Sequence, residues 1–170
     1  MDRLLNVSSR RRALTGALAA ALFSLALAGS LPRAARSAGG KCPYCNLAVL
    51  KNEPTLDNTV AMRHGANRIE YRCVYCAVAQ ANSDKYKGDV TILAPSEVKG
   101  KPVLLTRKAD RWTAKPATAV FVAEKAHHRY CQITYRALTG RPGFDAYVKK
   151  NARLRSARPV TLAQLVQTAK

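Results

Sequence analysis

Short runs of alternating apolar and polar residues occupy the middle of the chain. Thr59–Met62 and Arg68–Tyr71 have the composition of two strands, and His64–Asn67 between them is a turn signal, so a hairpin is predicted. Apolar residues then recur at helical spacing over Val74–Lys85, and Asp89–Ala94 is again strand-like. This part of the chain predicts the order strand, strand, helix, strand.

The second half of the chain has a similar pattern. Val103–Thr106 predicts a strand whose neighbour is Ala119–Val122. A helix is expected over Tyr130–Leu138, interrupted at Gly140–Gly143 and resumed over Phe144–Val148. The expected fold class is therefore α+β, built from two ββαβ halves.

The last residues predict one more strand and helix. Val160 is expected to end a short strand. Thr161 with Gln164 has the spacing of a capping box, in which each side chain bonds the other residue's backbone N–H at a helix start. A final helix is expected to follow.

The amino terminus has the pattern of an export signal. Arg10–Arg12 precede the uncharged run Ala13–Ala28, and this run, of about 16 residues, is shorter than the roughly 20 that span a bilayer. We expect a twin-arginine-like signal cleaved near Ala28 and a soluble periplasmic protein. Ser30 stands where a lipoprotein would have its cysteine, so no lipid anchor is expected there.

These patterns divide the chain into five predicted parts. They are an export signal in 1–28, a flexible lead-in in 29–41, a metal-binding ββαβ half in 42–96, a second half in 97–155 and a carboxy-terminal strand and helix in 156–170.

The chain is strongly basic, with 29 Lys and Arg against 10 Asp and Glu and a net charge of +19. An exported protein does not meet the chromosome, and no nucleic-acid-binding motif is present, so nucleic acid is not an expected partner. Acidic proteins and anionic membrane surfaces are the partners that this charge favours.

Four of the five cysteines form two Cys-x-x-Cys motifs, Cys42 with Cys45 and Cys73 with Cys76. A hairpin between the motifs, with the second motif at a helix start, is typical of a treble-clef metal site, because the helix amino terminus favours thiolates. Two disulfides would use the same cysteines in an oxidising compartment. Cys73 and Cys76 alone, between a strand and a helix, also fit a thioredoxin-like redox pair.

The fifth cysteine has two histidines beside it. His127 and His128 precede Cys131 by four and three residues, so one helical turn would bring an imidazole to the thiol. Thiolate with imidazole suits Cu(I) or Zn(II). The alternative is a buried cysteine next to two solvated histidines.

The chain contains no phosphate-binding loop, dinucleotide fingerprint or nucleophilic serine motif, so it is not expected to be an enzyme.

From Lys41 to Leu154 the chain resembles NosL, the copper chaperone family that accompanies nitrous oxide reductase. The resemblance lies in the first cysteine turn, in RIEYRCVYCAVA and in the segment from Asp110 to Asn151. It implies an exported Cu(I) carrier with two ββαβ halves. Asn46 and Leu47 stand where the family has glycine and methionine.

The leading hypothesis is a periplasmic Cu(I) chaperone that passes metal to an acidic periplasmic protein, such as a copper enzyme. Zn(II) is the alternative ion. The expected metal ligands of the protein are Cys42, Cys45, Cys73 and Cys76, with Cys131, His128 and His127 as additional candidates. A thiol–disulfide oxidoreductase and a structural zinc-binding interaction module are the alternative functions.

Overall fold

The computed structural model describes residues 40–49, 59–125 and 132–170. Ala34–Lys170 forms one compact unit. Its strands are β1 Val60–His64, β2 Asn67–Tyr71, β3 Val90–Ala94, β4 Val103–Lys108, β5 Arg111–Lys115, β6 Val120–Lys125 and β7 Ile133–Leu138. Its helices are α1 Val74–Ala81, α2 Arg141–Lys150 and α3 Leu162–Thr168, with a 3₁₀ turn at Ala152–Leu154.

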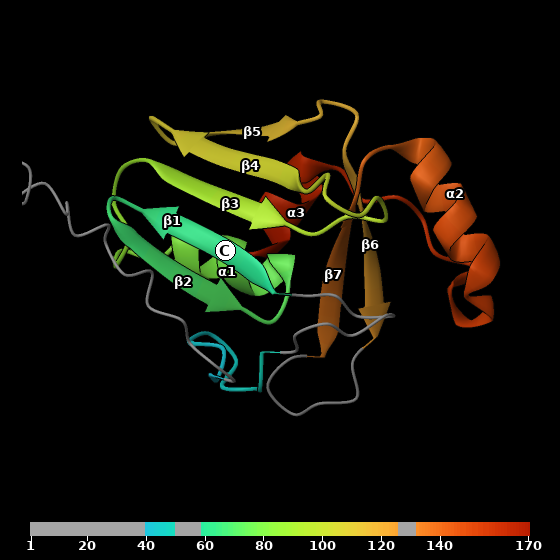
Figure 1. The fold of residues 1–170 in the computed structure, drawn as a ribbon, viewed down its shortest axis with the longest axis horizontal. Coiled ribbons are helices and arrows are strands. Elements are labelled where there is room, and N and C mark those ends of the chain that lie inside the picture. Colours follow the sequence, from blue (N-terminus) through green and yellow to red (C-terminus); the bar gives the residue numbers. More distant parts are fainter. Residues whose placement is uncertain (1–39, 50–58, 126–131) are drawn as a thin grey trace, which may run out of the picture. The chain divides into compact units, whose positions relative to one another are not determined.

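Five strands form an antiparallel sheet in the order β2-β1-β3-β4-β5 (Figure 1). Alternation of buried and half-buried residues along β3 and β4 shows why these segments are strands: Val90, Ile92 and Ala94 point to the core, as do Val103 and Leu105. Successive side chains of a strand point to opposite faces of the sheet, so apolar residues at every second position bury one face only. The sheet therefore presents one apolar face for helices to cover.

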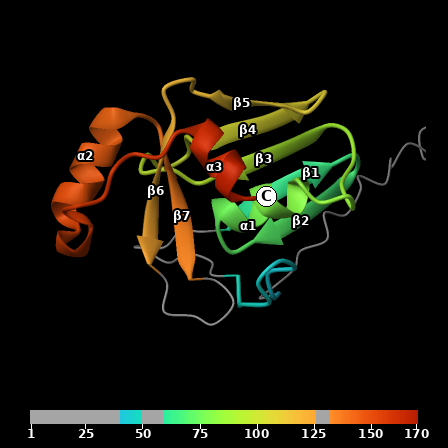
Figure 2. The ribbon, with the colours of Figure 1, turned by 180° about the vertical axis from the view of Figure 1, so that it is seen from behind.

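Helices α1 and α3 lie on that apolar face (Figure 2). Helix α1 is short and almost wholly buried on its inner side, and Leu165 is the buried residue of α3. The predicted capping box of α3 is confirmed, since the Thr161 hydroxyl accepts from the Gln164 N–H while the Gln164 side chain accepts from the Thr161 N–H. The predicted hairpin and the strand at β3 are also confirmed.

A buried arginine holds the carboxy-terminal end of α1. Arg107 of β4 is only 6% exposed. Its guanidinium donates to the carbonyls of Ala81 and Tyr86, and to that of Gly88 at 2.8 and 3.2 Å. It also lies 6.0 Å from the centre of the Trp112 ring. The bond to Ala81 satisfies a carbonyl that the helix end leaves without a partner, and the others hold the segment that follows the helix.

A second, two-stranded sheet of β6 and β7 packs against α2. Val122, Leu138, Phe144 and Leu154 form its own small core. Phe121 of β6 also bridges to Val160, with backbone hydrogen bonds of 2.8 Å in both directions. This bridge brings the chain back towards the first sheet before α3 begins.

The helix predicted over Tyr130–Leu138 is wrong where the structure describes it, because Ile133–Leu138 is strand β7. Tyr135 and Ala137 are both buried, which is a spacing of two residues, and Ile133 and Thr134 are β-branched. Branched and aromatic side chains fit a pleated surface better than a helix.

The two predicted ββαβ halves and the treble clef are not confirmed. Sequence analysis missed strand β5, Arg111–Lys115, and this strand pairs with β4 in place of the predicted neighbour Ala119–Val122. Because β4 and β5 extend the same sheet as β1, β2 and β3, that sheet joins residues of both proposed halves. What the structure shows is an α+β fold with antiparallel sheets.

The predicted export signal and most of the lead-in lie outside the described residues. Among the residues that are described, no helix is long and apolar enough to cross a bilayer.

Candidate functional site

The first Cys-x-x-Cys motif forms a tight loop held by its own backbone. Lys41 bridges to Ala48, the Cys42 N–H donates to the Leu47 carbonyl at 2.7 Å, and the Asn46 N–H donates back to the Cys42 carbonyl at 2.8 Å. Asn46 has a φ of 58°, in the left-handed region that asparagine tolerates better than most residues. This turn brings both cysteines of the motif to one side of the loop.

The second motif begins helix α1. Cys73 is the N-cap residue, with extended backbone, and Cys76 lies in the first turn. The strand β2 ends two residues earlier, at Tyr71, so the chain passes directly from sheet to helix through this motif. Partial positive charge at a helix amino terminus stabilises nearby thiolates.

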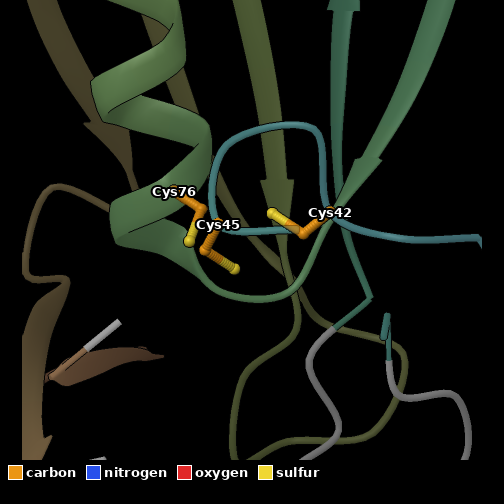
Figure 3. Close-up of side chains that lie close together, drawn as sticks. All are labelled: Cys42, Cys45 and Cys76. Atoms are coloured by element: carbon orange, nitrogen blue, oxygen red, sulfur yellow. The ribbon is translucent and has the colours of Figure 1, made fainter. Parts of the chain in front are cut away.

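Three of the four sulfurs meet between the loop and the helix. The Sγ atoms of Cys42, Cys45 and Cys76 all lie within 4.8 Å of one another (Figure 3). These cysteines are 0%, 3% and 0% exposed, and all are free thiols. Metal–sulfur bonds of about 2.3 Å place thiolates around one ion about 4 Å apart. The cluster can therefore hold a metal ion after a small inward movement.

The fourth sulfur lies beside this group. Cys73 is fully buried, and its Sγ is 3.5 Å from that of Cys76, but it does not belong to the group of three. It lies close enough to Tyr135 of β7 to influence the pKa of that phenol. The structure thus brings the four predicted cysteines to one place, arranged as three and one.

The two thiols of the loop differ in acidity. The pKa of Cys42 is lowered to about 5, first by the Cys76 thiol that donates to it and then, against burial, by the backbone N–H groups of Arg72, Cys45 and Tyr44. Burial raises the pKa of Cys45 to about 11. Cys42 is therefore the thiolate around which the cluster is organised.

Arg72 ties the cysteine loop to the end of β2. Its guanidinium donates to the Ala48 carbonyl at 2.8 Å, and its backbone N–H points at the Cys42 sulfur. One residue thus links the loop and the second motif from both its main chain and its side chain.

Sequence analysis missed three tyrosines next to the sulfurs. Tyr44 meets the edge of Tyr75 with ring centres 6.0 Å apart, and Tyr75 stacks on Tyr135 at 5.6 Å. The Tyr75 hydroxyl donates to the Thr168 carbonyl at 3.4 Å. The signal was available, because tyrosine is the third residue of both motifs, in Cys-Pro-Tyr-Cys and Cys-Val-Tyr-Cys.

The remaining predicted ligands, His127, His128 and Cys131, lie outside the described residues. Their participation stays a prediction from the sequence.

No protein-family model matches the chain, and no curated protein matches it in sequence. In structure, the chain is similar to the mercury-bound form of MerB2, with a TM-score of 0.54 and 13% sequence identity. The match covers 66% of this chain and 56% of that chain, so this chain spans little more than half of the protein it resembles. The likeness concerns the fold. Fold and site together define an α+β protein with a buried thiol cluster that can hold a metal ion.

Proposed function

We propose that this protein carries a soft metal ion, Cu(I), and delivers it to another protein in the periplasm. The observation that supports this is the meeting of Cys42, Cys45 and Cys76 as free, buried thiols within 4.8 Å of one another. Thiolates are ligands that Cu(I) and Zn(II) both accept. The NosL resemblance favours Cu(I), and MerB2 was solved with mercury, another thiophilic ion.

The electrostatics of the cluster suit a cation. Cys42 has a pKa lowered to about 5, so it is a thiolate at neutral pH even before metal arrives. An ion that binds there meets one ligand already ionised and displaces protons from the others. Cys76, in the first turn of α1, gains from the positive end of that helix.

The arrangement of ligands also suits release. Cys42 and Cys45 belong to the loop 40–49, which is outside both sheets, whereas Cys76 belongs to α1. All three sulfurs are buried, so the loop has to open before a ligand from an acceptor protein replaces Cys76 or the loop pair one bond at a time. The excess of Lys and Arg over Asp and Glu favours an acidic acceptor.

The test is metal loading of the purified protein under reducing, oxygen-free conditions. We expect one Cu(I) per chain by elemental mass spectrometry, with Cys42, Cys45 and Cys76 protected from alkylation. A Cys131→Ser variant that binds equally well would remove that thiol from the predicted ligands. A reduced protein that takes up neither Cu(I) nor Zn(II) would refute the proposal.

Zinc that a chelator removes only as the protein unfolds would instead identify a structural zinc module, because such ions contribute folding energy.

The proposed location is tested separately. Replacing Arg10, Arg11 and Arg12 with lysine should hold a precursor in the cytoplasm if the twin-arginine route exports the chain. Unchanged export of that variant would contradict this route while leaving metal binding untouched.

A thiol–disulfide oxidoreductase is the second candidate, because the Cys73 and Cys76 sulfurs lie 3.5 Å apart at a helix start. Both sulfurs are 0% exposed, whereas an attacking thiolate must reach a substrate disulfide. Reduction of insulin by the purified protein would favour this function over metal transport.

A further inference from the structure

The position of Cys73 relative to the other three thiols points to a role in choosing the metal. The sulfurs of Cys42, Cys45 and Cys76 already form a compact triangle. The Cys73 sulfur lies outside this triangle, 3.5 Å from the sulfur of Cys76. A fourth ligand is therefore within reach of the site without being part of it.

Local backbone geometry explains this position. Cys73 is the N-cap of α1 and Cys76 lies three residues later, so the two cysteines occupy the N-cap and N3 positions that a capping box uses. The Cys73 side chain makes no capping hydrogen bond to the helix backbone. A change between staggered χ1 rotamers moves a cysteine sulfur by about 3 Å with the backbone in place. Cys73 can therefore enter or leave the coordination of an ion without unwinding the helix.

Charge decides which ion benefits from this fourth thiolate. Three thiolates around Cu(I) and four around Zn(II) leave the same net negative charge in the site. A fourth thiolate on Cu(I) would add one more negative charge to a buried cluster, which is costly. Structural Zn(II) sites take four ligands in a tetrahedron, and thiolate sets of four are common among them.

We propose that Cys73 is the residue that determines metal specificity: Cys42, Cys45 and Cys76 alone hold Cu(I), and Zn(II) recruits Cys73 as its fourth ligand. This inference rests on the proposed metal-binding function and adds to it that the site has two coordination states. The protein then keeps its Cu(I) site intact while its affinity for zinc depends on one side chain.

The experiment compares full-length wild type with Cys73→Ser, measuring Cu(I) and Zn(II) affinities by competition with chelators. We expect Cys73→Ser to weaken Zn(II) binding at least about tenfold and to leave Cu(I) binding unchanged. Co(II), as a spectroscopic substitute for zinc, should lose part of its thiolate-to-metal absorption in the variant. Cys73→Ala repeats the test without a hydroxyl, in case serine caps α1 and changes its stability.

Cys45→Ser is the matched control, since it removes a member of the triangle and should weaken both metals. Equal losses of Cu(I) and Zn(II) in Cys73→Ser would overturn the inference, as would unchanged binding of both. Failure of the wild type to bind either metal would be a failure of the proposed function itself, which the first titration reveals before any variant is made.

Discussion

Groups of opposite charge lie at the two ends of helix α1, and their surroundings differ. At the amino-terminal end, thiols from the loop 40–49 and from α1 gather around the Cys42 thiolate. At the carboxy-terminal end, the Arg107 guanidinium is surrounded by backbone carbonyls, among them those of Ala81 and Gly88. Each charge is opposite in sign to the partial charge of the helix end that it faces, and this arrangement is favourable.

The two ends of α1 differ in whether groups of the protein itself satisfy the charge. Arg107 donates at least four hydrogen bonds to the protein and stacks near Trp112, so this end needs nothing from outside. The thiol cluster has sulfurs that form no disulfide and lie at distances that a bridging ion would shorten. A buried charge that the protein itself satisfies is structural, whereas a buried cluster that a cation would satisfy is a candidate site.

The largest expected effect comes from removing the arginine at the carboxy-terminal end of α1. Arg107→Leu removes the Arg107 donors from the Ala81 carbonyl at the end of α1 and from the Tyr86 and Gly88 carbonyls that follow it. Hydrogen bonds from a charged group are worth about 1.5–3 kcal/mol each. We expect a loss of about 3–5 kcal/mol in the free energy of unfolding, measured in urea. Arg111→Leu, at an exposed position of the neighbouring strand, is the control and should change stability little. A similar stability for both variants would show that Arg107 is not structural.

Removing a thiol from the cluster at the amino-terminal end of α1 should instead weaken metal binding. Cys42→Ser removes the ligand that is ionised first, and we expect Cu(I) affinity to fall about 100-fold, or about 2.7 kcal/mol. Arg107→Lys, which keeps a cation at the other end, should bind Cu(I) as the wild type does. A Cys42→Ser protein with undiminished affinity in a chelator competition would contradict the proposed site.

The metal-free cluster should also make stability depend on pH. With its pKa lowered to about 5 from an ordinary 9.0, Cys42 has lost its proton in the folded protein while the unfolded chain still holds it. Stability should therefore rise between about pH 5 and pH 9, and fall again above pH 9 as the Cys45 thiol, with a pKa raised to about 11, stays protonated only in the folded state. Urea unfolding across this range checks the prediction, and Cys42→Ser should abolish the rise. A rise of the same size in that variant would assign it to another group.

The smallest expected effect concerns the shape of the cysteine loop. Asn46→Val places a β-branched residue at a φ of 58°, which we expect to cost about 1–2 kcal/mol of stability and to weaken metal binding. Asn46→Gly is the control, because glycine adopts this conformation freely. Thermal unfolding and a Zn(II) titration of both variants separate backbone strain from loss of the asparagine side chain, since equal damage in both would point to the side chain.

Much of the first part of the fold was predictable because its signals are local. The hairpin of β1 and β2 follows from two strand-like runs around Gly65, and α1 begins where apolar residues change to helical spacing after Cys73. Helix α1 ends at Ala81, four residues before the predicted end, and there the Ala81 carbonyl accepts from Arg107. No local pattern around residue 81 indicates an arginine that is distant in sequence.

The second part was less predictable because its segments fit more than one structure. Ile133–Leu138 contains apolar residues at both two-residue and helical spacings, and only pairing with β6 decides for a strand. In strand β5, charged or polar residues alternate with Trp112 and Ala114. These two residues pack against the core, which the segment itself does not reveal.

The sequence by itself determined that two Cys-x-x-Cys motifs exist, that the second begins a helix and that each carries a tyrosine beside its second cysteine. Only the tertiary structure decided that Cys42, Cys45 and Cys76 form one group, that Cys73 stands next to it, and that Arg107 closes the opposite end of α1. The physical reason is one of range. Spacing along the chain sets which side chains share a turn, whereas distances between thiols on separate segments depend on how the cysteine loop, β2 and α1 pack together.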